Sequence, residues 1–213
     1  MKSGLTIMRG QRSDIGMRAW FPLTLLGLIA AGFGIGVGSA WYMAESAQPL
    51  DAIKLGPWVA SPNAGTLDAD SYSRARLART GELPLGSGEG LALVARTDSS
   101  GRELQSNCIY RVLGQTPQAR LWTLSVEAAD GLPLGAGDGI TAVGSDGLFR
   151  QGNGGLNVVV APTPQAGIWL VSDGGERSQS PIRLVARLYD TPARTVTALT
   201  NFVMPTISRE RCL

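Results

Sequence analysis

The feature that most constrains this chain is an uncharged apolar stretch that runs from Ala19 to Ala44. An α-helix rises about 1.5 Å per residue, so roughly 20 residues cross a hydrocarbon layer about 30 Å thick. Trp20 and Phe21 at one end and Trp41 and Tyr42 at the other occupy positions where interfacial aromatic residues gather. The stretch therefore predicts a single transmembrane helix over residues 19–44.

The charges on either side of this stretch predict its orientation. Residues 1–18 carry a net charge of +3, whereas the rest of the chain carries −1. The positive-inside rule therefore makes residues 1–18 a basic cytoplasmic tail and places the remainder outside the cytoplasm. A cleaved signal peptide is the alternative, because residues 38–40 and 45–47 are candidate small-residue cleavage sites. The span is longer than the usual apolar region of about 7–15 residues in a signal peptide, which favours a retained anchor.

Glycines recur within the span at a spacing typical of packed membrane helices. The positions concerned are Gly32, Gly34, Gly36 and Gly38. Pairs of small residues four positions apart let two helices approach closely, so they predict a homo-oligomer or a partner's helix. The alternative is that glycine is simply frequent in membrane helices.

After the span, the pattern predicts a tether and then one exported domain. Residues 45–66 lack periodicity and are interrupted by proline, which is typical of a linker. The domain over residues 67–213 opens with a helix from Asp68 to Thr80, capped by Thr66 or Asp68 and ended by Gly81.

The remainder of the domain has the pattern of short β-strands separated by turns. Strands are expected at Leu91–Ala95, Cys108–Val112, Leu121–Val126, Ile140–Val143, Val158–Ala161, Ile168–Val171 and Ile182–Tyr189. In the last of these, Ile182, Leu184, Ala186 and Leu188 are expected on one face and Arg183, Val185, Arg187 and Tyr189 on the other. Spacings of roughly 8–14 residues without intervening helices predict a mainly β fold, an antiparallel, jelly-roll-like β-sandwich.

Composition excludes several classes of function. The chain has no histidine, which removes the commonest general base and metal ligand. Its two cysteines are too few for a structural zinc site, so no metal and no cofactor are expected. Cys108 and Cys212 are instead expected to form a disulfide in an oxidising compartment. The basic excess lies in the N-terminal tail, so the domain is not expected to bind nucleic acid.

Four residues are candidates for ligand binding. The sequence 83–91 is echoed at 132–140, and each copy sets a carboxylate, Glu89 or Asp138, between glycines. Such a pair suits a hard cation or sugar hydroxyls, although a recurring turn that launches a strand explains the echo equally. Trp122 and Trp169 would stack on a sugar if exposed, whereas a strand tryptophan more often lies in the core.

An ordered set of short motifs resembles a known bacterial family. They lie at Asp70–Arg79, Leu83–Gly86, Cys108–Tyr110, Leu121–Ser125, Gly167–Leu170, Arg187–Asp190 and Met204–Ile207. This order resembles the family called domain of unknown function 1214 over nearly the whole chain after residue 66. The resemblance implies a jelly-roll β-sandwich and kinship with larger secreted proteins, with no established activity. The chain departs from the family pattern at Val126-Glu127, where Tyr-Asp is frequent, and at Ile168, where asparagine precedes the tryptophan.

Two functions from different classes follow. The first is a non-catalytic binding or interaction module, anchored in the bacterial inner membrane with its domain in the periplasm and an envelope protein or glycan as partner. For that function no catalytic residue is assigned. The alternative is a glycan-active hydrolase working through carboxylates such as Glu89, Glu127 and Asp138, and it requires two convergent acids in a cleft. Arg187 and Asp190 are expected to form a structural ion pair.

Overall fold

The computed structural model describes residues 15–45, 50–82, 84–85, 88–115, 119–134, 139–146, 155–172, 179–191, 199 and 202–213. The chain consists of two compact units, Met1–Ala47 and Gln48–Leu213. The expected residue Asp138 lies outside the described residues.

The first unit contains one long helix, α1 (Ile15–Glu45). Its segment Trp20–Ala44 has a mean hydropathy of 1.8 and is long and apolar enough to cross a membrane. Its large apolar side chains, among them Leu28, Phe33 and Ile35, are exposed within the chain. A helix of this length, composition and N-terminal position is compatible with a single-pass anchor, and a signal sequence has the same properties.

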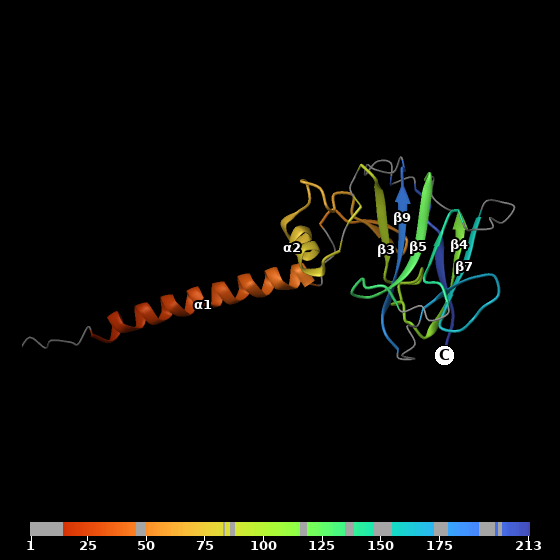
Figure 1. Ribbon diagram of the computed structural model, residues 1–213. Coiled ribbons are helices and arrows are strands. Elements are labelled where there is room, and N and C mark those ends of the chain that lie inside the picture. Colours follow the sequence, from red (N-terminus) through yellow and green to blue (C-terminus); the bar gives the residue numbers. More distant parts are fainter. Residues whose placement is uncertain are drawn as a thin grey trace, which may run out of the picture. The chain divides into compact units, whose positions relative to one another are not determined.

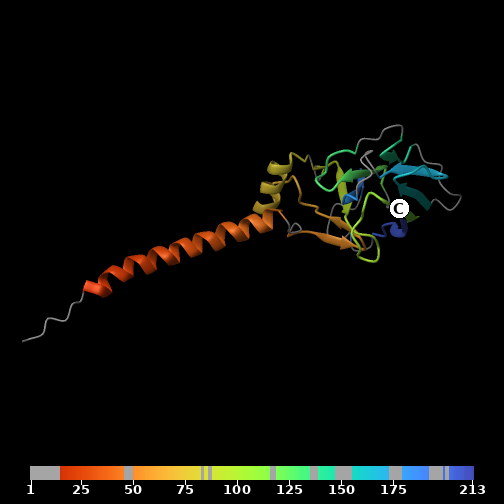
Figure 2. The same cartoon turned by 90° about the horizontal axis from the view of Figure 1, so that it is seen from below.

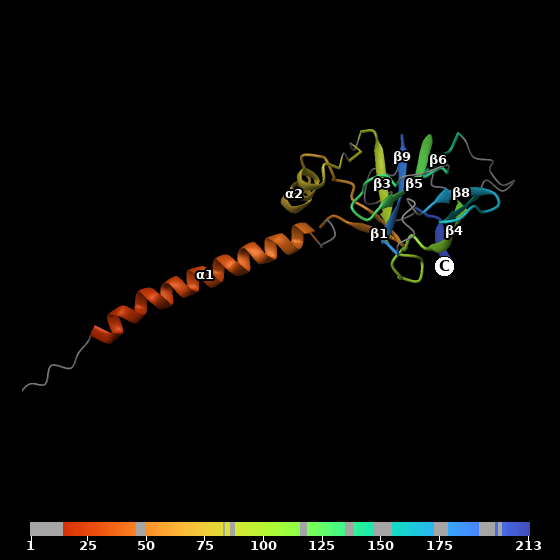
Figure 3. The ribbon, with the colours of Figure 1, turned by 60° about the horizontal axis from the view of Figure 1, so that its bottom comes forward.

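The second unit is mainly β, as the sequence predicts. Its described strands are β1 (Ile53–Leu55), β2 (Trp58–Ala60), β3 (Gly90–Ala95), β4 (Cys108–Gln115), β5 (Leu121–Ala128), β6 (Ala142–Gly144), β7 (Gly155–Ala161), β8 (Ile168–Val171), β9 (Ile182–Tyr189) and β10 (Thr206–Cys212). They form a six-stranded sheet in the order β1-β2-β3-β9-β5-β6 and a four-stranded sheet in the order β10-β4-β7-β8. Figure 1 shows β3, β9 and β5 side by side, and Figure 3 shows β1 and β6 on opposite sides of them.

The two sheets share one hydrophobic core, which makes the domain a β-sandwich. The core contains Leu93, Leu124 and Leu184 from the six-stranded sheet and Val112 and Val160 from the four-stranded sheet. In β9 the expected alternation is confirmed, because Ile182, Leu184, Ala186 and Leu188 all belong to this core. The intervening residues of β9 therefore point to the opposite face of the six-stranded sheet.

Two strands lie within residues 45–66, where the sequence predicts a tether without regular structure. The hairpin β1–β2 extends the six-stranded sheet, since Trp58 pairs with Ala95 of β3 and Ala60 with Leu93. The Trp58 side chain is fully buried, and its Nε1 donates a hydrogen bond of 2.7 Å to the carbonyl oxygen of Pro205. Residues 53–60 thus belong to the domain, because the free edge of β3 supplies the backbone partner that this short segment lacks alone.

Two further details differ from the arrangement that the sequence predicts. Strand β8 pairs with β7 in parallel, from Val158 opposite Ile168 to Ala161 opposite Val171. Strand β8 has four residues, so the chain has to turn back only a short way to pair with β7 in parallel. The segment 162–167 is long enough for this return. Strand β10, which the sequence did not predict, pairs antiparallel with β4 along the edge of the four-stranded sheet.

The short helix of the domain begins later than expected. Helix α2 (Ser71–Thr80) is capped by Asp70 rather than by Thr66 or Asp68, because the Asp70 carboxylate accepts the backbone N–H groups of Tyr72 and Ser73. Gly81 ends the helix in a left-handed conformation (φ 66°), as predicted. In Figures 1 and 2, α2 lies on the side of the domain that carries β2 and β3.

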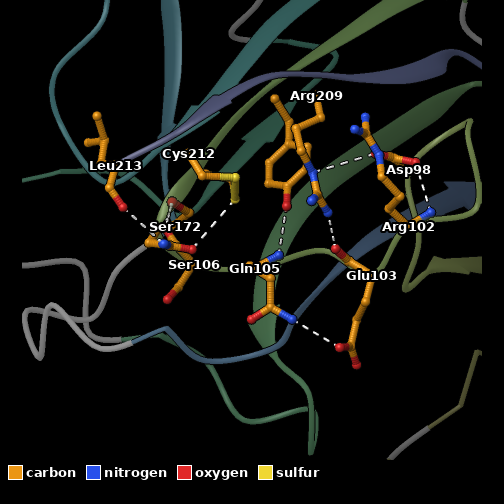
Figure 4. The surroundings of a disulfide bond; sticks show 12 residues. Asp98, Arg102, Glu103, Gln105, Ser106, Ser172, Arg209, Cys212 and Leu213 are labelled. Carbon is orange, nitrogen blue, oxygen red and sulfur yellow. Dashed lines mark hydrogen bonds and ion pairs between the residues drawn. A yellow bond between two sulfur atoms is a disulfide. The ribbon is translucent and has the colours of Figure 1, made fainter.

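A disulfide and an ion pair connect strand β10 to the rest of the sandwich. Cys108 and Cys212 lie at disulfide distance, which supports the predicted bond. Nearby, the buried carboxylate of Asp98 accepts hydrogen bonds from Arg102 and lies 3.6 Å from Nε of Arg209 on β10. Figure 4 shows Arg209 between Asp98 and the backbone carbonyl of Glu103. These contacts tie the last strand to the loop before β4.

Candidate functional site: an arginine-walled cavity

A cavity of about 220 Å³ lies on the face of the six-stranded sheet that points away from the core. Its floor is formed by outward-facing residues of β3 and β9, including Ala92, Val94 and Val185. Its other walls come from α2, from Pro57–Ala64 and from the segment that follows α2, which contributes Glu82, Pro84 and Leu85. All of these residues belong to the second unit.

Strand register determines which side chains meet on this floor. In β9, Arg183 and Arg187 alternate with core residues, and β3 and β5 flank β9 on its two sides. Arg183 lies directly opposite Glu127 of β5, and Arg187 lies opposite Ala92 of β3. Because directly opposed side chains on one face of a sheet lie within contact distance, Arg183 and Glu127 form a cross-strand ion pair.

Glu127 lies at the centre of the polar network beneath the cavity. One of its carboxylate oxygens accepts bonds from Nε and Nη2 of Arg183, at 3.0 and 2.8 Å. The other oxygen accepts bonds from Nη2 of Arg187 at 2.9 Å and from the Ser125 hydroxyl at 3.1 Å. Arg183 Nη2 also donates to Glu82, at 3.0 Å, and so joins the cavity wall to the sheet.

Part of this network is shielded from solvent and part of it is exposed. The side chains of Arg183 and Glu127 are only 3% and 9% exposed, whereas that of Arg187 is 31% exposed. Gly131 packs against the Arg183 guanidinium so closely that a Cβ atom there would lie 2.4 Å from Nη2. A glycine at this position therefore leaves room for the guanidinium, and its positive φ of 93° suits glycine as well.

Burial and hydrogen bonding act in opposite directions on the ionisation of Glu127. Burial raises the pKa of this carboxyl, but the hydrogen bonds from Arg183 and Arg187 outweigh it and leave the pKa lowered. For Arg183, burial lowers the pKa, and the bonds to Glu127 and the nearby charge of Glu82 outweigh it, so the pKa is raised. Both groups are therefore charged at neutral pH, and Glu127 is a poor proton donor.

Several arginines line the cavity. Among the residues that the structure describes, the lining includes Arg76, Arg96, Arg183 and Arg187 and the carboxylate of Glu82, with Glu127 beneath. Burial and the like charges of Arg183 and Arg76 lower the pKa of Arg96, against the opposing effect of Glu82 and Glu127. The described part of the site combines guanidinium groups with apolar walls.

Of the carboxylates that the sequence offers for hydrolysis, Glu127 lies beneath the cavity, whereas the expected ligand-binding residues that the structure describes lie elsewhere. Glu89 is exposed in the turn before β3, and Trp122 is 6% exposed within the core. Trp169 is partly buried beside the four-stranded sheet, with its Nε1 donating to the carbonyl of Ala161 at 2.9 Å. None of these three residues lines the cavity. A Cβ atom added at the anchor glycines Gly32 or Gly36 would meet nothing within 4 Å in the described chain beyond their own helix backbone.

The expected ion pair between Arg187 and Asp190 is also replaced by other partners. Arg187 bonds to Glu127 and Ser125, while Asp190 lies 3.9 Å from Arg120 in an exposed contact. The sequence carries one signal for these arginines: two charges four residues apart, on one face of an otherwise apolar strand. Poorly solvated charges on that face of a central strand require partners of opposite charge, and the Glu127 carboxylate is the partner of both arginines.

Comparison with known proteins gives a family match for part of the sandwich. Residues 89–193 match the model of the family described as a protein of unknown function, DUF1214, which confirms the resemblance over that part of the chain. This segment therefore belongs to the DUF1214 family, and it contains Glu127, Arg183 and Arg187. A search of curated proteins gives no match.

Two solved structures are similar to the chain. The VPA0106 protein from Vibrio parahaemolyticus is 16% identical, with a TM-score of 0.54 over 87% of this chain and 45% of that protein. An uncharacterized protein from Burkholderia cenocepacia is 19% identical, with a TM-score of 0.35 over 57% of this chain and 29% of that one. The chain thus spans less than half the length of either, and the first similarity supports the fold alone.

Proposed function

We propose that this protein is a non-catalytic binding module of the bacterial cell envelope. Helix α1 anchors it in the inner membrane with the N-terminus in the cytoplasm, and the β-sandwich binds a small ligand in the periplasm. The observation that carries the proposal is the cavity of about 220 Å³ whose arginines are held in place by a buried carboxylate. A concave site with apolar walls and a few convergent polar groups is the usual form of a ligand site.

Binding is favoured over carboxylate-dependent hydrolysis by the chemistry of Glu127. A glycosidase of the usual kind needs two carboxyl groups flanking the scissile bond, one of them with a raised pKa. Glu127 has a lowered pKa, and both of its oxygens accept hydrogen bonds from arginines. Glu82 is also engaged by Arg183. With its lowered pKa, Glu127 stabilises and orients the arginines and is poorly suited to deliver a proton.

The binding part of the proposal is tested by hydrogen exchange of the full chain in detergent micelles. We expect some members of a fragment set, neutral and anionic, to slow exchange in α2 and in residues 57–64, which form the cavity walls. Ala92→Phe places an aromatic ring in the cavity and should abolish this protection while circular dichroism stays unchanged. Absence of protection by every fragment, or equal protection in the Ala92→Phe variant, would overturn the proposal.

The location is tested by reporter fusions at the C-terminus in a bacterial host. We expect alkaline phosphatase fused after Leu213 to be active, because it matures only outside the cytoplasm, and a cytosol-dependent fluorescent reporter to be dark. Mass spectrometry of the extracted protein should recover peptides from residues 1–18, since the anchor is retained. A mature chain starting near Glu45 or Gln48, or a reporter active only in the cytosol, refutes the anchored arrangement.

A further inference from the structure

Three valines form a continuous apolar row on the floor of the cavity. Val59 of β2 pairs with Val94 of β3, and Val94 pairs with Val185 of β9. All three line the cavity, so they lie side by side on the face of the sheet that points away from the core. Neighbouring strands are about 4.8 Å apart, so the row offers an apolar strip about 10 Å long.

The other walls add apolar surface of fixed shape. Leu77 of α2 and Leu85 contribute aliphatic side chains. Pro57, Pro62 and Pro84 also line the cavity, and a proline ring is rigid and has no backbone N–H. These positions therefore offer a ligand no backbone donor, and little conformational freedom is lost at them when a ligand enters.

Polar side chains of the described lining already have partners within the protein. The pairs are Arg183 with Glu127 and Glu82, Arg187 with Glu127 and Ser125, Arg96 with the carbonyl of Ala129, Ser61 with Asp51, and Ser73 with Asp70. A charged ligand would have to compete with these bonds and would lose hydration as it entered. The lining therefore favours a ligand that needs no ionic partner.

The volume of the cavity sets the size of the ligand. An apolar cavity of about 150 Å³ accommodates a benzene molecule. The cavity of about 220 Å³ therefore corresponds to a body on the order of ten non-hydrogen atoms. A body of that size is long enough to cover the row of three valines.

We propose that the cavity binds a small uncharged aliphatic molecule, with its apolar body against Val59, Val94 and Val185. This inference rests on the proposed binding function and adds the chemical class of the ligand. Binding derives from the removal of apolar surface from water. The arginines and Glu127 hold β5 and β9 in register beneath the ligand and make no ion pair with it.

The test compares probes that share one apolar skeleton and differ in charge. They are cyclohexylmethanol, cyclohexanecarboxylate and the cyclohexylmethylammonium ion. Methyl NMR of the full chain in nanodiscs of deuterated phosphatidylcholine follows the signals of Val59, Val94 and Val185, with Val126 of the core as the internal reference. We expect the alcohol to shift the three cavity signals and to bind at least about tenfold more tightly than either ion, because an ion loses hydration without gaining a free partner.

A smaller probe tests whether apolar burial drives binding. Cyclopentylmethanol lacks one methylene group, and burial of a methylene raises affinity about fourfold. We therefore expect cyclopentylmethanol to bind about fourfold more weakly than cyclohexylmethanol. The Ala92→Phe protein, whose cavity is filled by the new ring, gives the baseline for partition of both alcohols into the lipid.

A nearly isosteric variant tests the valine row. Val94→Thr keeps the branched shape and strand preference of valine and adds a hydroxyl group. It should weaken the binding of cyclohexylmethanol by about fivefold, because the ligand would cover that hydroxyl. Val203→Thr is the matched control, since Val203 is 73% exposed and lies outside the cavity lining, and it should leave binding unchanged.

The outcomes separate this inference from the proposed binding function. If either ion binds as tightly as the alcohol and its binding is lost in Ala92→Phe, the cavity is a ligand site and the uncharged class is wrong. The class is also wrong if the two alcohols bind equally, or if Val94→Thr binds cyclohexylmethanol as well as the unaltered chain does. If no probe shifts the cavity signals of the unaltered chain, the proposed binding function itself fails.

Discussion

Replacing Glu127 by alanine lowers the free energy of unfolding by about 3–5 kcal/mol, the usual cost of removing one partner from a buried ion pair. The carboxylate is 9% exposed and accepts hydrogen bonds from both Arg183 and Arg187. Without it, Arg183, which is 3% exposed, keeps its charge beside a second arginine, and its remaining carboxylate partner is Glu82, whose side chain is 33% exposed. A buried charge that loses its most buried partner is strongly destabilising.

The measurement is urea unfolding of the full chain in micelles, followed by near-ultraviolet circular dichroism. Glu89→Ala is the matched control, because Glu89 is an exposed carboxylate at the start of β3 and its loss should cost less than about 0.5 kcal/mol. A Glu127→Ala protein within about 1 kcal/mol of the unaltered chain would show that the network is not needed for the fold.

The same network gives stability a defined dependence on pH. Burial raises the pKa of Glu127, and the bonds from Arg183 and Arg187 outweigh it, so the folded pKa lies below its ordinary value of 4.5. A lowered folded pKa means that the contribution to stability is fully present above about pH 4.5 and is lost as the pH falls through the folded pKa. Asp98 shifts in the same direction: burial raises its pKa, and the bonds from Arg102 and Ser100 outweigh it. The Glu127→Ala protein should therefore lose less stability on acidification than the unaltered chain does. It should still lose some, because the contribution of Asp98 remains.

Removing the Cys108–Cys212 bond produces the second large effect. Its two cysteines are 104 residues apart, and the chain-entropy model assigns a crosslink over such a loop about 4–5 kcal/mol. The bond joins residues that are already register partners of β4 and β10, so its loss also allows β10 to fray. We expect Cys108→Ala/Cys212→Ala to lower the midpoint of thermal unfolding strongly while the sandwich still forms.

Two controls accompany this prediction. The unaltered chain treated with a reductant should shift by the same amount as the double variant, because both lose the same crosslink. Thiol labelling of protein taken from its native compartment, under denaturing and non-reducing conditions, should find no reactive thiol. Two reactive thiols per chain, or a midpoint unchanged by reduction, would contradict the bond.

Strands rich in branched residues were predictable because their local pattern agrees with their surroundings. The segment Ile182–Tyr189 alternates core residues with Arg183, Val185 and Arg187, and it forms β9 as expected. By contrast, β1 and β2 are only three residues each, and β10 carries Arg209, Glu210 and Arg211 in an edge strand. Such segments become strands because a neighbouring strand offers free backbone groups, which the local sequence does not reveal.

The sequence by itself determined the apolar span, the mainly β character of the domain and the pairing of its two cysteines, because each depends on local composition, period or count. Tertiary structure alone decided the cavity. Glu127 lies 56 residues from Arg183, and Glu82 lies 101 residues from it, and they meet only because β9 is inserted between β3 and β5. Strand order is set by the packing of the two sheets over one core, a non-local property that no short window of residues contains.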